Sequence, residues 1–190
     1  KSLDDLKNFD SISSHGDSTQ KETLVSVEGI GKTGYMNPFD LDVKKGDIVG
    51  LAGLLGSGRS EITNLLFGTQ KPDTGSVSLH GKPVSIHSPR KAIAHHVALS
   101  PEDRKEDGII AGLSVRENIA LALQVRRGWF KNLSIKKQTE LAEKYIKMLS
   151  IKTSGVNQPI ETLLGGNQQK VILARWLATD PELLIVDEPT

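Results

Sequence analysis

A glycine-rich turn that leads into a helical pattern holds the residues of this chain most suited to chemistry. In such a turn, backbone N–H groups and the positive end of a helix surround polyphosphate oxygens. The usual pattern has Lys before Ser or Thr, whereas this chain has Arg59 before Ser60, whose hydroxyl is a group that binds Mg²⁺. Because the planar guanidinium differs in reach from an ammonium, we expect phosphate binding to be retained better than turnover. The predicted phosphate-binding residues are Gly53, Leu54, Leu55, Gly56, Ser57, Gly58, Arg59 and Ser60. The alternative is a glycine-rich turn without a ligand.

Two neighbouring carboxylates, Asp187 and Glu188, follow the apolar run 183–186. The end of an apolar strand would bring Asp187 within reach of a Mg²⁺ ion, and Glu188 beside it could polarise a water aimed at a γ-phosphate. Two adjacent acids at a strand end cost free energy unless a cation or water satisfies them. We therefore predict Ser60 and Asp187 as Mg²⁺ ligands and Glu188 as the catalytic residue. A solvated turn is the alternative interpretation.

A second pair of glycines, Gly165 and Gly166, lies directly before another helical pattern. This helix start would be a second site for an anion on the same chain. One nucleotide does not need two such sites, so we expect this helix start to face the γ-phosphate bound by another copy or a sister domain. An ordinary helix start is the alternative.

Hydrophobic periodicity predicts the elements that position these residues. Short alternating runs at 24–28, 39–43 and 77–79 are typical of half-buried antiparallel strands, and the more continuous runs at 47–52, 96–99 and 183–186 are typical of buried strands. Helical spacing and capping residues predict helices at 60–67, 88–95, 114–125, from 134 onward and from about 167 onward. The pattern predicts an α/β fold with mainly parallel strands, an antiparallel β subdomain and a helical insert.

Composition excludes several classes of protein. The 24 Lys and Arg residues nearly balance the 23 Asp and Glu residues, so nucleic acid is not an expected partner. The absence of Cys excludes disulfides and thiolate metal sites. No apolar run approaches the ~20 residues of a membrane span, so work at a membrane would need a partner subunit.

The motifs together resemble those of the nucleotide-binding domains of ABC transporters. The matching segments are 53–60 (Walker A), 100–103 (Q-loop), 163–168 (signature) and 183–188 (Walker B). The resemblance implies a P-loop NTPase core that binds ATP and Mg²⁺ and hydrolyses ATP. It also implies a sister ATP-binding domain, in the same polypeptide or a second copy, transmembrane permease subunits and, indirectly, a periplasmic sugar-binding protein. The location implied is peripheral, at the cytoplasmic face of the bacterial inner membrane.

The segments 50–59, 101–105 and 165–171 are most similar to the second, C-terminal ATP-binding domain of bacterial carbohydrate importers. Within that group, the segments 115–119, 121–124, 127–129 and 157–160 are similar to the galactofuranose importer. We therefore expect ATP-driven uptake of a sugar, with galactofuranose as the first candidate.

Four positions depart from the general family pattern. Arg59 replaces the Walker Lys, and Glu102 stands where a Gln usually senses Mg²⁺ and the membrane subunit. Leu164 replaces the signature Ser, and Asn167 replaces its Gln. These departures leave open a degenerate module that binds ATP and regulates a catalytic sister domain without hydrolysing it. The implied signature residues are Leu164, Gly165, Gly166, Asn167 and Gln168, and Tyr35 is the candidate ring for stacking on adenine.

The expected organisation has four parts. They are a polar leader or linker at 1–22, a P-loop core with the antiparallel β subdomain at 23–104, a helical subdomain at 105–165, and the signature helix with the Walker B strand at 166–190. The chain starts without Met and ends before the D-loop and the switch His of the family, so we expect a piece of a longer polypeptide.

Overall fold

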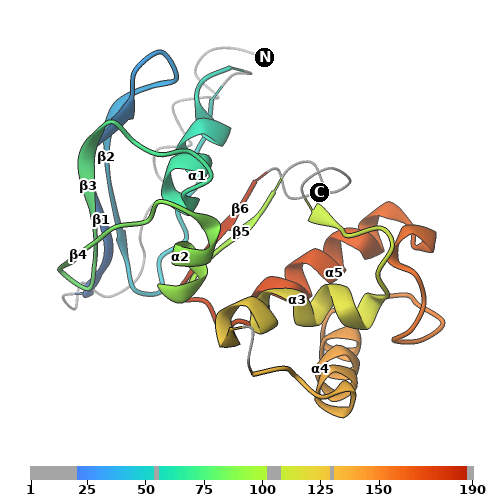
Figure 1. The fold of residues 1–190 in the computed structure, drawn as a ribbon. Coiled ribbons are helices and arrows are strands. Elements are labelled where there is room, and N and C mark those ends of the chain that lie inside the picture. Colours follow the sequence, from blue (N-terminus) through green and yellow to red (C-terminus); the bar gives the residue numbers. More distant parts are fainter. Residues whose placement is uncertain (1–20, 54–55, 102–107, 129–130, 188–190) are drawn as a thin grey trace.

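The computed structural model describes residues 21–53, 56–101, 108–128 and 131–187. Four strands form an antiparallel sheet in the order β2-β1-β3-β4 at one side of the molecule (Figure 1). Its strands are β1 (Thr23–Lys32), β2 (Met36–Lys44), β3 (Thr74–Leu79) and β4 (Lys82–Val84). Val25 and Val27 are buried and Ser26 between them is only partly buried, as expected for alternating side chains on a strand. The predicted antiparallel strands are confirmed.

Two helices lie between this sheet and the centre of the molecule, α1 (Arg59–Phe67) and α2 (Pro89–Ala94) (Figure 1). Gly68 ends α1 in the left-handed region, with φ of 76°, a conformation that glycine adopts without strain. The hydroxyl of Ser88 caps α2 by accepting a hydrogen bond from the backbone N–H of Lys91 at 3.3 Å. Both helices confirm the sequence prediction.

A second sheet consists of two parallel strands, β5 (Val97–Ser100) and β6 (Leu183–Val186). The prediction of a strand at 47–52 is wrong, because these residues form no strand and Ile48 is fully exposed. An extended segment needs a neighbour that takes up its backbone N–H and C=O groups. Among the described residues, no strand pairs with 47–52. The described parallel part is therefore smaller than the mainly parallel core that we expected.

The remaining helices gather on the other side of β5 and β6 (Figure 1). They are α3 (Val115–Arg127), α4 (Ile135–Met148), the short 3₁₀ helix η3 (Ile160–Thr162) and α5 (Gly165–Leu177), which begins two residues before its predicted start. α3 packs against both α4 and α5. Ala142 and Tyr145 are buried on α4, and Leu141, Ile146 and Leu149 pack beside them, so one face of this predicted helix is apolar and lies in the core.

Buried apolar side chains form two clusters. One joins the antiparallel sheet to α1, and includes Val27, Ile30 and Leu65. The other joins α2, β5 and the helices α3 to α5. Leu183 and Ile185 of β6 pack against both clusters, so β6 connects the two halves of the core.

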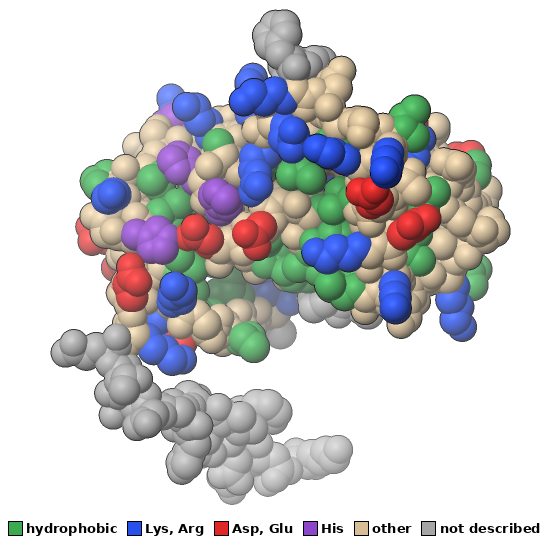
Figure 2. Space-filling view, turned by 90° about the horizontal axis from the view of Figure 1, so that it is seen from below, with side chains coloured by type: hydrophobic (Ala, Val, Ile, Leu, Met, Phe, Trp, Pro, Cys, Tyr) green, Lys and Arg blue, Asp and Glu red, His purple; other side chains and the backbone are tan. Residues whose placement is uncertain are grey.

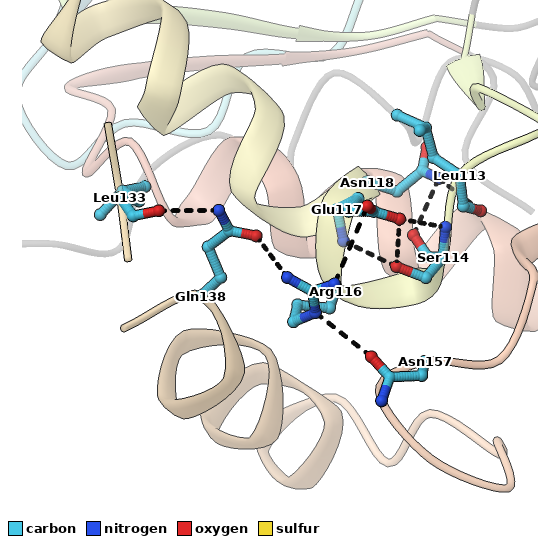
Figure 3. A network of polar contacts seen from close by, with 8 residues as sticks. All are labelled: Leu113, Ser114, Arg116, Glu117, Asn118, Leu133, Gln138 and Asn157. Carbon is cyan, nitrogen blue, oxygen red and sulfur yellow. Dashed lines mark hydrogen bonds and ion pairs between the residues drawn. The ribbon is translucent and has the colours of Figure 1, made fainter. Parts of the chain in front are cut away.

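A polar network fixes the start of α3 (Figure 3). The helix predicted from 114 begins with a capping box of Ser114 and Glu117, in which the backbone N–H of Ser114 donates to Glu117 Oε2 at 2.9 Å and that of Glu117 donates to Ser114 Oγ at 3.3 Å. Arg116 donates to Gln138 on α4 at 2.7 Å and to Asn157 at 3.3 Å. The network therefore holds α3, α4 and the loop before η3 in one arrangement.

A buried pair, Asn118 of α3 and Arg175 of α5, joins these two helices. Arg175 donates to the backbone oxygen of Asn118 at 2.8 Å, to its side-chain oxygen at 2.6 Å and to the backbone oxygen of Gly108 at 2.5 Å. The amide of Asn118 donates in turn to backbone oxygens of Ile110 and Leu113, at 3.1 and 3.3 Å. Burial lowers the pKa of Arg175 to about 10, so the guanidinium remains charged at neutral pH.

Histidine and acidic side chains lie next to one another at one end of the face shown in Figure 2. His80, just after β3, lies between two carboxylates, with Nε2 2.5 Å from Glu182 Oε2 and Nδ1 3.3 Å from Glu22 Oε1. The hydrogen bond to Glu182, and then the one to Glu22, raise the pKa of His80. This contact links the antiparallel sheet to the residue that precedes β6.

Candidate functional site

The glycine-rich turn leads into α1 through left-handed backbone. Gly56 and Gly58 have φ of 81° and 92°, and Gly58 is the N-cap residue of α1, without a side chain to cap the helix. The N–H groups in the first turn of a helix have no partner within the helix. With no capping side chain in front of them, they can bind an anion at the positive end of α1. Arg59 and Ser60 are the first two residues of this helix.

Two of these glycines have close neighbours. A Cβ atom on Gly53 would lie 2.1 Å from Ser57 Oγ and 2.7 Å from Ser57 Cβ, so a larger residue there would displace the turn. A Cβ atom on Gly58 would lie 2.8 Å from Met36 Sδ, the flexible end of a side chain that can move aside. At Gly58 it is the left-handed φ of 92° that disfavours a side chain.

A hollow of about 570 Å³ opens beside the turn. Its lining residues come from two segments, the β1–β2 turn (32–38) and the glycine-rich turn with the start of α1 (56–58 and Glu61), together with Thr74. Tyr35 lies in this lining, and its hydroxyl accepts a hydrogen bond from Asn64 of α1 at 3.2 Å. The structure thus places Tyr35 next to the predicted phosphate-binding residues, while its stacking on adenine stays a prediction.

The carboxylate of Asp187 lies against α1. Thr63 Oγ1 is 3.4 Å from Asp187 Oδ2 and 2.9 Å from the backbone oxygen of Ser60. Thr63 therefore links the carboxylate of Asp187 to the first turn of α1, at the backbone oxygen of Ser60 rather than at its hydroxyl. A hydroxyl and a carboxylate are hard oxygen ligands of the type that Mg²⁺ takes when phosphates and waters complete its shell. The residues present thus fit Mg²⁺ bound together with a nucleotide.

Four predicted site residues lie outside the described residues. They are Leu54 and Leu55 of the glycine-rich turn, the Q-loop residue Glu102 and the predicted catalytic residue Glu188.

The second pair of glycines forms the first turn of α5. Leu164 is the N-cap residue; it is 79% exposed and supplies no capping hydrogen bond. Leu164, Gly166 and Asn167 line a hollow of about 520 Å³, together with Ser100 and Val186 at the carboxyl ends of β5 and β6. This hollow shares no lining residue with the one beside α1. The two helix starts therefore do not meet at one ligand within the described part of the chain.

The two polar side chains in this turn bind the chain itself. Asn167 Oδ1 accepts a hydrogen bond from the backbone N–H of Lys152 at 2.9 Å. Gln168 is buried and donates to the backbone oxygens of Ile160 and Glu161, at 3.3 and 3.5 Å. Both residues position the approach to α5, and the backbone of Gly165 and Gly166 is the part of this turn that suits an anion.

Sequence reasoning missed Thr63, Asn118 and Arg175. Thr63 could have been noticed because it places a hydroxyl on the inward stripe of α1, where Leu66 and Phe67 are buried. Asn118 and Arg175 each lie among apolar residues on the buried face of their helix, but which atoms they contact depends on how α3 packs on α5.

In the described ranges, no group of three or more His, Cys, Asp or Glu side chains is arranged to hold a metal ion. A Mg²⁺ site of the kind described above needs one carboxylate and one hydroxyl and would not form such a group. Within the same ranges, no helix is both long and apolar enough to cross a membrane.

Comparison with known proteins gives a family and several relatives. A family model described as ABC transporter matches residues 36–190. The chain is 54% identical over 167 residues to the galactofuranose transporter ATP-binding protein YtfR of Escherichia coli O157:H7, covering 88% of this chain and 33% of that protein. It is 49% identical over 170 residues to the fructose import ATP-binding protein FruK of Bifidobacterium longum (strain NCC 2705), covering 90% of this chain and 33% of that protein. The chain thus spans about a third of the length of these curated relatives.

Solved structures with a similar fold share less sequence. A dimeric ATP-binding cassette in a post-hydrolysis state, bound to ADP and Pi, is 24% identical with a TM-score of 0.74, covering 88% of this chain and 75% of that one. A nucleotide-free ATP-binding cassette from an ABC transporter is 23% identical with a TM-score of 0.68, covering 88% and 70%. At this level of identity the likeness shows the fold, and it confirms the predicted fold class.

Proposed function

The chain belongs to the ABC transporter family, and we propose that it is the second of two ATP-binding domains in the ATPase subunit of a bacterial sugar importer. ATP binding and hydrolysis by the intact protein then drive sugar uptake, with galactofuranose as the first candidate. The observation that carries this proposal is the 54% identity over 167 residues with a galactofuranose transporter ATP-binding protein. The relatives named for fructose and arabinose import support the broader class of sugar.

In this proposal, ATP binds at the start of α1. Backbone N–H groups of the glycine-rich turn and the guanidinium of Arg59 hold the phosphates, and Tyr35 stacks on the adenine. Ser60 and Asp187 would hold Mg²⁺, which when bound would neutralise the charge that develops on the phosphate oxygens. Glu188 orients and polarises the attacking water. The contact of Asp187 with the first turns of α1 supports this arrangement.

The start of α5 is proposed to bind the γ-phosphate of a nucleotide held by the sister domain. The separate hollows at α1 and α5 support this pairing, because a single nucleotide on this chain would leave the second anion site unused. The ADP-bound cassette of similar fold was solved as a dimer. Because Leu164 has no hydroxyl, only backbone N–H groups at the start of α5 would contact this γ-phosphate.

The other partners and the location belong to the same proposal. The proposed partners are transmembrane permease subunits, to which a periplasmic sugar-binding protein would deliver the sugar. Binding to the permease would place the protein at the cytoplasmic face of the inner membrane. Glu102 would lie near the contact with the permease. The division into a leader (1–22), a core (23–104), a helical subdomain (105–165) and the signature and Walker B segment (166–190) is retained as a prediction.

Transport by the intact protein tests the proposal. The intact subunit is reconstituted with its permease and sugar-binding protein in proteoliposomes, and ATP-dependent uptake of labelled galactofuranose, fructose and arabinose is compared. We expect ATP-dependent uptake of one of the three sugars. Arg59→Ala should reduce both this uptake and the affinity for ATP. ATP affinity unchanged by Arg59→Ala would refute the phosphate role, and no ATP-dependent uptake of any sugar would refute the importer function.

Single-turnover measurements separate this proposal from the degenerate alternative. With the sister site disabled, hydrolysis of bound ATP that is lost in Glu188→Gln supports an active site. ATP that stays intact over hours would instead identify a module that binds nucleotide without turnover.

A further inference from the structure

We propose that Thr63 is a positioning residue that holds the carboxylate of Asp187 over the start of α1, ready to bind Mg²⁺. The inference rests on the proposed function, because it needs nucleotide and Mg²⁺ at this site. It concerns a side chain that belongs to none of the sequence motifs and that lies one turn beyond Ser60.

The register of β6 on α1 brings the two side chains together. Alternate residues of a strand point to the same face, and Leu183 and Ile185 both pack against the cluster that contains Leu65 of α1. Asp187 is the next residue in this alternation, directly after β6. The strand therefore directs two apolar side chains and then one carboxylate toward α1.

The buried face of α1 changes from apolar to polar at the level that Asp187 reaches. Residues three or four apart share a helix face, so Ser60, Thr63 and Phe67 lie along one stripe. Phe67 is packed in the core at the end of the helix, whereas Thr63 is 5% exposed and presents a hydroxyl. Thr63 is thus the buried polar group of α1 at the level of Asp187.

A single proton on Thr63 can serve either of two acceptors. Its Oγ1 lies 2.9 Å from the backbone oxygen of Ser60 and 3.4 Å from Asp187 Oδ2. The first is a full hydrogen bond and the second is longer than one. Because an ionised acceptor binds a hydrogen-bond donor more strongly than a carbonyl does, a small approach of the carboxylate turns the Thr63 O–H toward Asp187 Oδ2, and Thr63 then donates its hydrogen bond there. The hydroxyl then restrains one carboxylate oxygen and leaves the other for the metal.

The test compares two buried threonines in the intact protein. Thr63→Val keeps the shape of the side chain and removes the hydroxyl, Thr63→Ala is a second variant, and Thr63→Ser keeps the hydroxyl. The matched control is Thr179→Val, because Thr179 is equally buried and donates to a backbone oxygen three residues earlier, that of Trp176, at 2.6 Å. Calorimetry measures ATP affinity with Mg²⁺ and with EDTA, and thermal unfolding without nucleotide checks that each variant folds.

We expect Thr63→Val to reduce the gain in ATP affinity that Mg²⁺ provides by about three- to tenfold, within the range for losing one hydrogen bond of ordinary net strength. Affinity in EDTA should stay unchanged, and Thr63→Ser and Thr179→Val should keep the Mg²⁺ gain.

An unchanged gain in both Thr63→Val and Thr63→Ala, or an equal loss in Thr179→Val, would overturn the inference. Asp187→Asn distinguishes this failure from failure of the proposed function. If Asp187→Asn loses the Mg²⁺ gain and Thr63→Val does not, only the inference is wrong. If the unsubstituted protein binds no ATP, or Asp187→Asn keeps the full gain, the proposed Mg²⁺-ATP site is wrong and the role of Thr63 falls with it.

Discussion

Replacing Asn118 by Leu should destabilise the packing of α3 on α5 by more than one hydrogen bond is worth. Asn118 is fully buried, and its side chain bonds Arg175 at 2.6 Å and both the backbone N–H and the oxygen of Ile110, at 2.9 and 3.1 Å. Leu has the same branching but no polar atoms, so these partners lose their bonds. At ~1–3 kcal/mol for each of these three unpaired groups, we expect a loss of about 3–9 kcal/mol, a large part of the ~5–15 kcal/mol that stabilises a typical domain.

Arg175→Met supplies the second half of a double-mutant cycle. This variant removes the buried cation together with the cost of keeping it out of water, so the loss should be smaller than for Asn118→Leu. In the double variant no cation is left unpaired. Its loss of stability should therefore be smaller than the sum of the losses in the two single variants by about 1.5–3 kcal/mol, the range for hydrogen bonds to a charged group.

Native-state hydrogen exchange of the α3 and α5 amides in the intact protein measures these losses as free energies of local unfolding. Losses that add to within about 0.5 kcal/mol would show that the two side chains act independently. That result would refute the reasoning, because it would mean that Asn118 does not satisfy the Arg175 cation.

Three further perturbations follow from the structure. Gly58→Ala should lower stability by about 1–2 kcal/mol, because its φ of +92° is left-handed, and it should weaken ATP binding, because Gly58 belongs to the proposed phosphate-binding turn. Gly81→Ala, at φ +70° with nothing within 4 Å, is the control, and equal ATP affinity in both variants would contradict the role of the turn. Leu164→Ser should raise the free energy of unfolding of α5 by about 1 kcal/mol through an added N-cap, and an unchanged melting temperature would count against it. Hydrogen bonds to Glu182 and Glu22 raise the pKa of His80, so the stability that this contact adds is complete below the unfolded pKa near 6.5 and is lost as pH rises through the higher folded pKa. The melting temperature of the unsubstituted protein should therefore fall over this pH window, and that of His80→Gln should not. Identical pH profiles for the two proteins would exclude the contact.

Local signals predicted the elements whose causes are local. The capping box of Ser114 and Glu117 is written within four residues, and both of its hydrogen bonds are present. The glycine that ends α1 and the Ser–Pro start of α2 likewise depend on their own backbone conformation. These features could be read without knowing what packs against them.

The misses have causes in tertiary structure. The apolar run at 47–52 has the composition of a strand, but a strand exists only with a partner, and no partner is present among the described strands. Thr63 became a site residue only through the register of β6 on α1, and the bond of Arg175 to Gly108 spans 67 residues of sequence. Periodicity predicts which face of an element is buried, but not which atom of another element meets it.

The distribution of helix caps ties the fold to the proposed site. The starts of α2, α3 and α4 are capped by the hydroxyls of Ser88, Ser114 and Ser134. The starts of α1 and α5, the two that border the hollows proposed to bind phosphate, have Gly58 and Leu164 as N-cap residues and no capping side chain. A missing cap costs a helix about 1 kcal/mol where the N-cap is an apolar residue such as Leu164 and a few tenths where it is Gly58, but it leaves first-turn N–H groups for an anion. The two helix starts without a side-chain cap are therefore the two where a bound anion could take its place. The stabilisation expected for Leu164→Ser measures how much stability the missing cap costs α5.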